Sequence, residues 1–84
     1  MTRNKLYNND LKILTKEMKS KIDRDEQKGT WENVPICRLL EMLKDEVKEL
    51  ENALLSEPKE NIIKECADVA NFVMMIAGNT RRKL

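Results

Sequence analysis

The sequence predicts an all-α protein, and three observations support this fold class. The 84 residues include only two glycines and two prolines, so few positions interrupt a helix. Aromatic residues make up 4% of the chain, and runs of β-branched residues are few, which argues against a sheet. Charged residues at 37% and hydrophobic residues at 40% are typical of helices with one apolar and one charged face. We expect residues 1–84 to form one domain, an antiparallel helical bundle.

The small size of the chain predicts that the bundle is completed by a second copy. A chain of this length buries only about 60% of the surface that its unfolded form exposes. It has two cysteines and no histidine, so a disulfide scaffold, a four-ligand zinc site and a histidine-based catalytic triad are not expected. Oligomerisation is the remaining common route to stability, and we expect a homodimer or homotetramer.

Charge and hydropathy limit the partners. The 16 basic and 15 acidic residues leave a formal charge of +1, whereas nucleic-acid-binding domains usually carry a strong basic excess. The longest apolar run, residues 62–77, is short for a bilayer and is interrupted by Asp68 and Asn71. No apolar signal region follows Met1. We therefore expect a cytoplasmic protein with no nucleic acid and no membrane as partner.

The first helix is predicted to begin between Asn4 and Asp10 and to end near Gly29, a residue that suits a helix C-terminus. Any of three polar residues is a possible N-cap for a later start: Asn8, Asn9 or Asp10. The helix is marked by one apolar stripe at helical spacing: Tyr7, Leu11, Leu14, Met18 and Ile22.

Two further helices are predicted over residues 36–55 and 58–77. Pro35 suits the first turn of the second helix, and Asn33 is a plausible cap near it. The turn at residues 56–59 is short, so these two helices are expected to be antiparallel neighbours. The third helix is apolar around nearly its whole circumference, which predicts that part of it packs against a second subunit. Gly78-Asn79 is expected to end it, with residues 81–83 as a basic tail.

Two carboxylate pairs at helical spacing predict a magnesium site. Glu65 and Asp68 share one face of the third helix, and Glu46 and Glu49 repeat the spacing on the second. Carboxylates are rarely buried unless paired or bound to a metal, and Mg²⁺ prefers oxygen ligands. Each pair also has a plainer interpretation. Glu46 and Glu49 would simply be a solvated face, and Glu65 and Asp68 would pair with a lysine or arginine of another helix.

Three other residues are candidates for substrate binding, each with a structural alternative. Trp31 either stacks on a nucleobase or closes the end of the bundle. Lys28 either approaches a phosphate or is a solvated lysine at a helix end. Asn71, one turn beyond Asp68, either binds sugar, phosphate or a metal-bound water, or forms a hydrogen bond across a subunit interface.

The sequence resembles the MazG-like nucleotide pyrophosphohydrolases, which are all-α NTP pyrophosphatases. The resemblance rests on Asp45-Glu46-x-x-Glu49, on Glu65-x-x-Asp68 and on two flanking segments, residues 28–31 and 70–72. Asp45 departs from the pattern, because the family usually has a glutamate there.

The resemblance implies a function and a site. Glu46, Glu49, Glu65 and Asp68 would be catalytic residues and ligands of the Mg²⁺ cofactor. The enzyme would cleave a (d)NTP to a (d)NMP and pyrophosphate, in homodimers or dimers of dimers with sites near the subunit contacts. Two alternatives stay open on the residues alone: a non-enzymatic helical oligomerisation module, and a relative that binds nucleotides without cleaving them.

Overall fold

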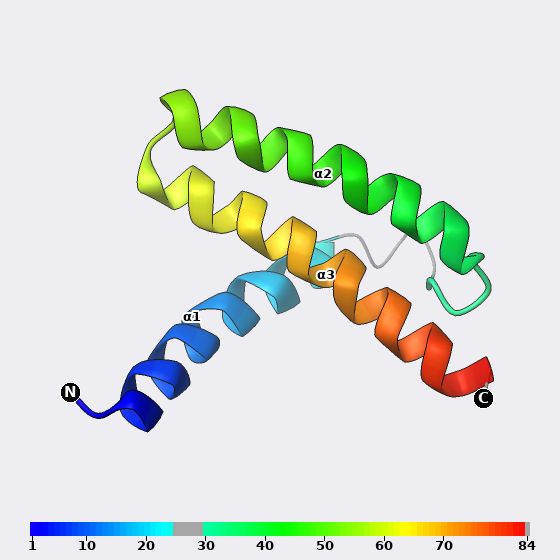
Figure 1. Cartoon of the computed structure of the whole chain (residues 1–84), viewed down its shortest axis with the longest axis horizontal. Helices are drawn as coiled ribbons and strands as arrows, with labels where there is room; N and C mark the ends of the chain where they lie inside the picture. The colour runs from blue at the N-terminus through cyan, green and yellow to red at the C-terminus, as the bar shows by residue number, and fades with distance from the viewer. Residues whose placement is uncertain (25–29, 84) are drawn as a thin grey trace.

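Three helices make up the fold in the computed structural model, which describes residues 1–24 and 30–83. They are α1 (Arg3–Arg24), α2 (Ile36–Ser56) and α3 (Lys59–Lys83) (Figure 1). The described residues contain no strand, so the predicted all-α class is confirmed. No helix within these residues is long and apolar enough to cross a membrane.

Helices α2 and α3 form an antiparallel hairpin, as predicted (Figure 1). The backbone N–H of Glu57 closes the end of α2 by donating to the Ala53 carbonyl at 2.9 Å. The Pro58 carbonyl then opens α3 by accepting from the N–H groups of Asn61 and Ile62. With so short a connection, the two helices are held side by side along their lengths.

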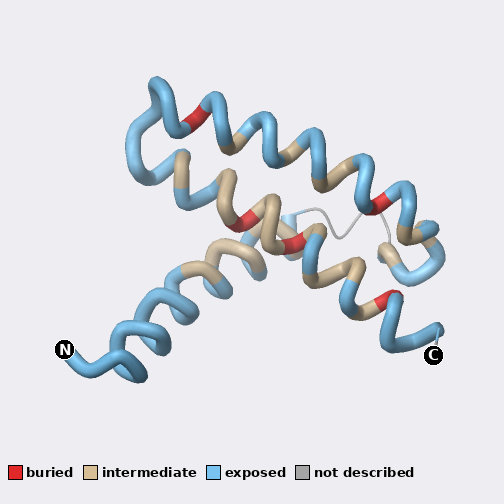
Figure 2. Tube along the Cα trace, viewed as in Figure 1, coloured by how far each residue is buried: buried red, intermediate tan, exposed pale blue. Residues whose placement is uncertain are grey.

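The core of this hairpin is thin. Its fully buried hydrophobic residues are Leu39, Ala53 and Ala67, of which two are alanines that let the helix backbones approach closely. Two polar residues of α3, Asn71 and Asn79, are also buried (Figure 2). A core this small leaves many large apolar side chains outside it.

Helix α1 is docked at one end only. Its C-terminal half packs on α3, and within the described residues it makes no comparable contact with α2. Every residue up to position 13 is exposed, whereas Leu14, Met18 and Ile22 are half-buried (Figure 2). The predicted apolar stripe is therefore covered for only half of its length.

Helix α1 starts earlier than predicted, whereas α2 starts at the predicted Ile36 but without the predicted cap. Helix α1 begins at Arg3, one residue before the predicted range, because the Thr2 hydroxyl accepts the Lys5 N–H at 3.2 Å and acts as the cap. At α2 the cap position is Pro35, with no side-chain hydrogen bond, so Asn33 is not the cap. The predicted helix end at Gly29 lies outside the described residues.

The predicted end of α3 at Gly78-Asn79 was wrong, since the helix continues to Lys83. Asn79 is completely buried, and its Nδ2 donates to the carbonyls of Trp31 (3.0 Å) and Val34 (3.1 Å). Its Oδ1 accepts from the Arg82 guanidinium. A Cβ at Gly78 would lie 3.2 Å from that guanidinium, so the glycine leaves room for it. These residues fix the loop before α2 to α3.

Candidate metal centre

Three carboxylates meet between α2 and α3. Glu46 comes from α2, and Glu65 and Asp68 come from successive turns of α3. Each offers one oxygen, these oxygens lie within 4.8 Å of one another, and all three residues are half-buried. The predicted spacing places Glu65 and Asp68 on one face of α3, and the hairpin brings Glu46 opposite them.

Glu49 lies outside this group. It is exposed on α2, and it is not among the three residues whose oxygens converge. Its charge nevertheless contributes to raising the pKa of both Glu46 and Glu65, so it belongs to the same region of negative potential. The structure thus brings together three of the four predicted ligands and leaves the fourth at the edge.

The carboxylates are crowded enough to change their acidity. Burial is the largest cause that raises the pKa of Glu46 above its usual 4.5, followed by the charges of Asp68 and Glu65. Burial also raises the pKa of Glu65, with Asp68 as the next cause. In both groups burial disfavours the ionised form first, and the neighbouring negative charges add to that effect.

One cation from the remaining helix, α1, reaches the group. The Lys21 ammonium of α1 lies 2.7 Å from Asp68 Oδ2, and both side chains are largely buried, at 20% and 25% exposed. Its charge lowers the pKa of Glu46 and Glu65 and so opposes the other causes. The plainer interpretation, that Asp68 pairs with a basic residue of another helix, is therefore confirmed. One ammonium does not neutralise three carboxylates.

Sequence reasoning missed Lys21. A signal was present, because Lys21 follows Met18 by three residues and precedes Ile22, and so lies on the face that carries the apolar stripe. A lysine on the buried face of a helix usually has an acidic partner on the helix that covers it.

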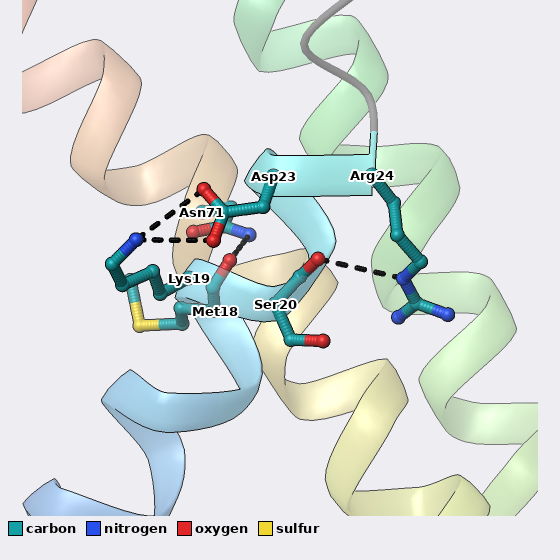
Figure 3. A network of polar contacts seen from close by, with 6 residues as sticks. All are labelled: Met18, Lys19, Ser20, Asp23, Arg24 and Asn71. Carbon is teal, nitrogen blue, oxygen red and sulfur yellow. Dashed lines mark hydrogen bonds and ion pairs between the residues drawn. The ribbon is translucent and has the colours of Figure 1, made fainter.

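Asn71 fastens α1 next to this ion pair. It is 5% exposed, and its Nδ2 donates to the Met18 carbonyl at 3.1 Å (Figure 3). Met18 and Lys21 are three residues apart on α1, as Asp68 and Asn71 are on α3. The Asn71–Met18 and Asp68–Lys21 contacts therefore lie one helical turn apart between α1 and α3. Asn71 Oδ1 has no hydrogen-bond partner among the described residues.

Trp31, another predicted substrate contact, lies away from the Lys21–Asp68 ion pair. Trp31 is half-buried, and its carbonyl is held by Asn79 at 3.0 Å. Asn79 follows Asp68 by eleven residues, which is about 16 Å along an α-helix. Trp31 thus lies toward the far end of α3 from the carboxylates, where the loop closes the bundle. Lys28 lies outside the described residues.

Comparison with protein families gives a match that spans most of the chain. Residues 11–81 match the family described as phosphoribosyl-ATP pyrophosphohydrolase. This chain belongs to the phosphoribosyl-ATP pyrophosphohydrolase family. The match includes all three converging carboxylates and Lys21. No curated protein and no solved structure matched the chain.

Membership in the phosphoribosyl-ATP pyrophosphohydrolase family confirms the fold class and the kind of family that the sequence resembles. It is an all-α family similar to the NTP pyrophosphatases, and it assigns the chain to the hydrolases that act on nucleotides with release of pyrophosphate. The structure adds an acidic group at the place where the two carboxylate pairs had been noted.

The donor set of this family member suits a hard divalent cation. Glu46, Glu65 and Asp68 supply only carboxylate oxygens, which Mg²⁺ prefers over nitrogen or sulfur. Cys66 lies between two of them in sequence but is not part of the group. Three carboxylates with one ammonium leave an excess of negative charge that a cation would balance, so the residues fit the metal on charge as well as on chemistry.

The outer side of α1 carries a shallow hollow of a different kind. Its lining is mostly charged and includes the exposed Lys19–Asp23 pair (Figure 3): Lys16, Lys19, Ser20, Asp23 and Arg24. Helical spacing places Lys16, Lys19, Ser20 and Asp23 away from the Met18–Lys21 face that contacts α3, with Arg24 at its border. The hollow is open and remote from the carboxylates, so we assign no part of the site to it.

Proposed function

We propose that this chain, as one helical domain, is a Mg²⁺-dependent nucleoside triphosphate pyrophosphohydrolase that converts a (d)NTP to a (d)NMP and pyrophosphate. The observation that carries the proposal is the convergence of Glu46, Glu65 and Asp68, from two helices, with a single ammonium to balance them. Family membership supports the reaction class, and the carboxylate group supports the cation.

In this proposal Glu46, Glu65 and Asp68 hold Mg²⁺, and Glu49 contributes negative charge at the rim. The ion supplies charge neutralisation for the phosphates and activation of the attacking water. The carboxylates stand on two packed helices, which keeps their oxygens together before the ion arrives. Such preorganisation matters because phosphoryl transfer depends mainly on positioning and on electrostatic stabilisation.

Substrate contacts are proposed at the residues named from the sequence. Asn71 has one free amide oxygen beside the site, and Lys28 and Trp31 belong to the segment before α2. Because Asn71 already holds α1 and Trp31 lies toward the other end of α3, we propose that Trp31 reads the base only if a second subunit brings it near. Base and sugar preference would then depend on the assembly.

We also propose that the chain self-associates through α1. Three large apolar residues on its undocked half are 42–64% exposed: Leu6, Tyr7 and Leu11. Tyr7 and Leu11 continue the stripe that α3 covers further along the helix, and Leu6 adjoins Tyr7. Helix α1 carries seven basic and three acidic residues, whereas α2 carries three basic and five acidic ones. This complementarity favours α1 of one copy against α2 of another.

The decisive experiment is pyrophosphate release from a panel of ribo- and deoxyribonucleoside triphosphates that includes phosphoribosyl-ATP, with Mg²⁺ and with chelator. We expect release that requires Mg²⁺. Sedimentation of the same sample tests self-association, with Leu11→Glu as the variant expected to shift the protein toward the monomer.

Three other results would overturn the proposal. Release that persists in chelator would exclude the metal mechanism. Tight nucleotide binding without release would identify a non-cleaving relative. An oligomer that neither binds nor cleaves any nucleotide would identify an interaction module.

A further inference from the structure

We propose that Lys21 binds the substrate. Without metal its ammonium pairs with Asp68; when a divalent cation binds Asp68, the ammonium pairs instead with a phosphate oxygen of the substrate. This inference rests on the proposed function and adds a residue of α1 to the site. Four observations support it.

The first is position. Lys21 comes from α1, which carries none of the three carboxylates, yet its ammonium lies 2.7 Å from Asp68 Oδ2 and its side chain is only 20% exposed. It is the only cation, among the described residues, whose charge acts on both Glu46 and Glu65.

The second is charge balance. Three carboxylates and one ammonium leave two negative charges, which one divalent cation cancels. Once the cation is bound, Asp68 no longer needs the ammonium, and the ammonium and the cation repel each other. A triphosphate then brings several new negative charges to the same place. The Lys21 ammonium therefore leaves Asp68, whose charge the cation now balances, and pairs with a phosphate whose charge is not balanced.

The third is mechanical freedom. The backbone of α1 is fastened beside Lys21 by the bond from Asn71 to the Met18 carbonyl, which does not involve the lysine. The side chain has four rotatable bonds and a compact ammonium with three donors, so it can change partners while the helix stays in place.

The fourth is the contrast with Lys19 on the same helix. Lys19 also forms an ion pair, with Asp23 at 3.0 Å, but its side chain is 77% exposed and Asp23 is 58% exposed. It lies two residues from Lys21 and so on the opposite side of α1. Lys19 therefore offers a matched control that loses the same charge from the same helix away from the carboxylates.

The test compares Lys21→Met, Lys21→Arg and Lys19→Met in the full chain, by titration calorimetry. Two ligands are used separately: Mg²⁺ alone, and inorganic tripolyphosphate at saturating Mg²⁺. Tripolyphosphate carries the phosphates common to all nucleoside triphosphates, so the result does not depend on base preference.

We expect opposite effects on the two ligands. Lys21→Met should bind Mg²⁺ about tenfold more tightly, because a repelling charge is gone. It should bind tripolyphosphate at least about tenfold more weakly, because a charge-assisted hydrogen bond is lost. Lys21→Arg should stay within about threefold of the wild type for both ligands, and Lys19→Met should not differ from it. Lys21→Gln is a second neutral variant, to be used if Lys21→Met does not fold.

Two results would overturn the inference alone. Weaker binding of both ligands in folded Lys21→Met would mean that Lys21 only supports the structure, and unchanged tripolyphosphate binding would mean that it never reaches the substrate. Absence of Mg²⁺ binding in the wild type would instead overturn the proposed function, and the inference with it.

Discussion

Helix α3 carries two polar clusters that differ in how well their groups are matched. Near its C-terminus, Asn79 is completely buried, and both its amide nitrogen and its oxygen are engaged, with two loop carbonyls and with Arg82. Toward its other end, Glu65 and Asp68 meet Glu46 with one ammonium between the three of them.

The two clusters differ in the binding capacity that they leave open: the Asn79 cluster is satisfied within the described chain, whereas the carboxylate cluster keeps an excess of negative charge. A polar group whose bonding capacity is filled inside the chain stabilises the fold and has nothing left for a ligand. A group that keeps an excess of one charge costs stability and is ready to bind the opposite charge. Asn79 is more deeply buried than the carboxylates, so burial alone would favour it as a binding site. The excess of negative charge favours the carboxylates instead.

Neutralising the unmatched cluster should have the largest effect. We expect Asp68→Asn and Glu65→Gln each to lower pyrophosphate release by at least about 100-fold, because each removes an anionic oxygen that holds the cation. Circular dichroism should show an unchanged helix content. Glu60→Gln, an exposed change on the same helix, is the control and should retain activity. Full activity in Asp68→Asn would show that the carboxylates are not the site.

Removing the matched cluster should affect stability and not metal binding. Asn79→Ala removes a completely buried amide that donates to two loop carbonyls. The Trp31 carbonyl keeps the Val34 N–H as a donor, whereas the Val34 carbonyl loses its bond from Asn79, so we expect a loss of about 3 kcal/mol in the free energy of unfolding. Urea unfolding measures this loss, with the exposed Asn61→Ala as control. Mg²⁺ affinity, measured where the variant is folded, should stay the same. A large loss of affinity would mean that the two clusters are coupled.

The affinity for Mg²⁺ should depend on pH, because protons and the cation compete for the same carboxylates. The pKa values of Glu46 and Glu65 are raised in the folded chain, so protons compete with the cation at higher pH than for ordinary glutamates. We expect Mg²⁺ affinity to be lower at pH 5.5 than at pH 7.5. Calorimetry at both values tests this expectation, and equal affinities would contradict it.

The same pKa shifts make the stability of the metal-free protein change with pH in the opposite direction to the Mg²⁺ affinity. Between the usual 4.5 and the raised pKa, the folded chain binds more protons than the unfolded chain. These two groups therefore make the metal-free protein less stable as pH rises through that window. Thermal unfolding in chelator measures the effect.

The smallest effect is expected at the exposed ion pair of α1. Lys19→Met should change the free energy of unfolding by less than about 0.5 kcal/mol, because a solvent-exposed pair is worth little. In the metal-free protein, Lys21→Met should cost about 1–3 kcal/mol by leaving a largely buried carboxylate unpaired. Similar losses in the two variants would remove the distinction between the pairs.

Local sequence patterns predicted the helices and most of the carboxylate group. Periodic apolar residues placed α1 and α2, and the spacing of Glu65 and Asp68 placed both on one face. What the patterns could not supply is which face meets which helix. Glu49 has the same spacing from Glu46, yet the packing of α2 leaves it at the rim.

The wrong prediction for the end of α3 has the same origin. Gly78-Asn79 reads locally as a helix terminus. In the structure the amide of Asn79 bonds to a loop far away in sequence, and Gly78 makes room for Arg82. Lys21 was missed because its role depends on a partner that is 47 residues away.

The clamp at Asn79 has a consequence for how the α2–α3 pair moves. The pair is closed at one end by the connection at residues 57–58 and at the other by the Asn79 bonds, so neither helix can slide past the other without breaking one closure. A slip of one residue would turn Glu46 by about 100° away from Glu65. The two closures therefore fix the register of the helices. The backbone amide hydrogens of α2 and α3 should exchange with solvent slowly and as one cooperative unit, whereas those of the first turns of α1 should exchange fast.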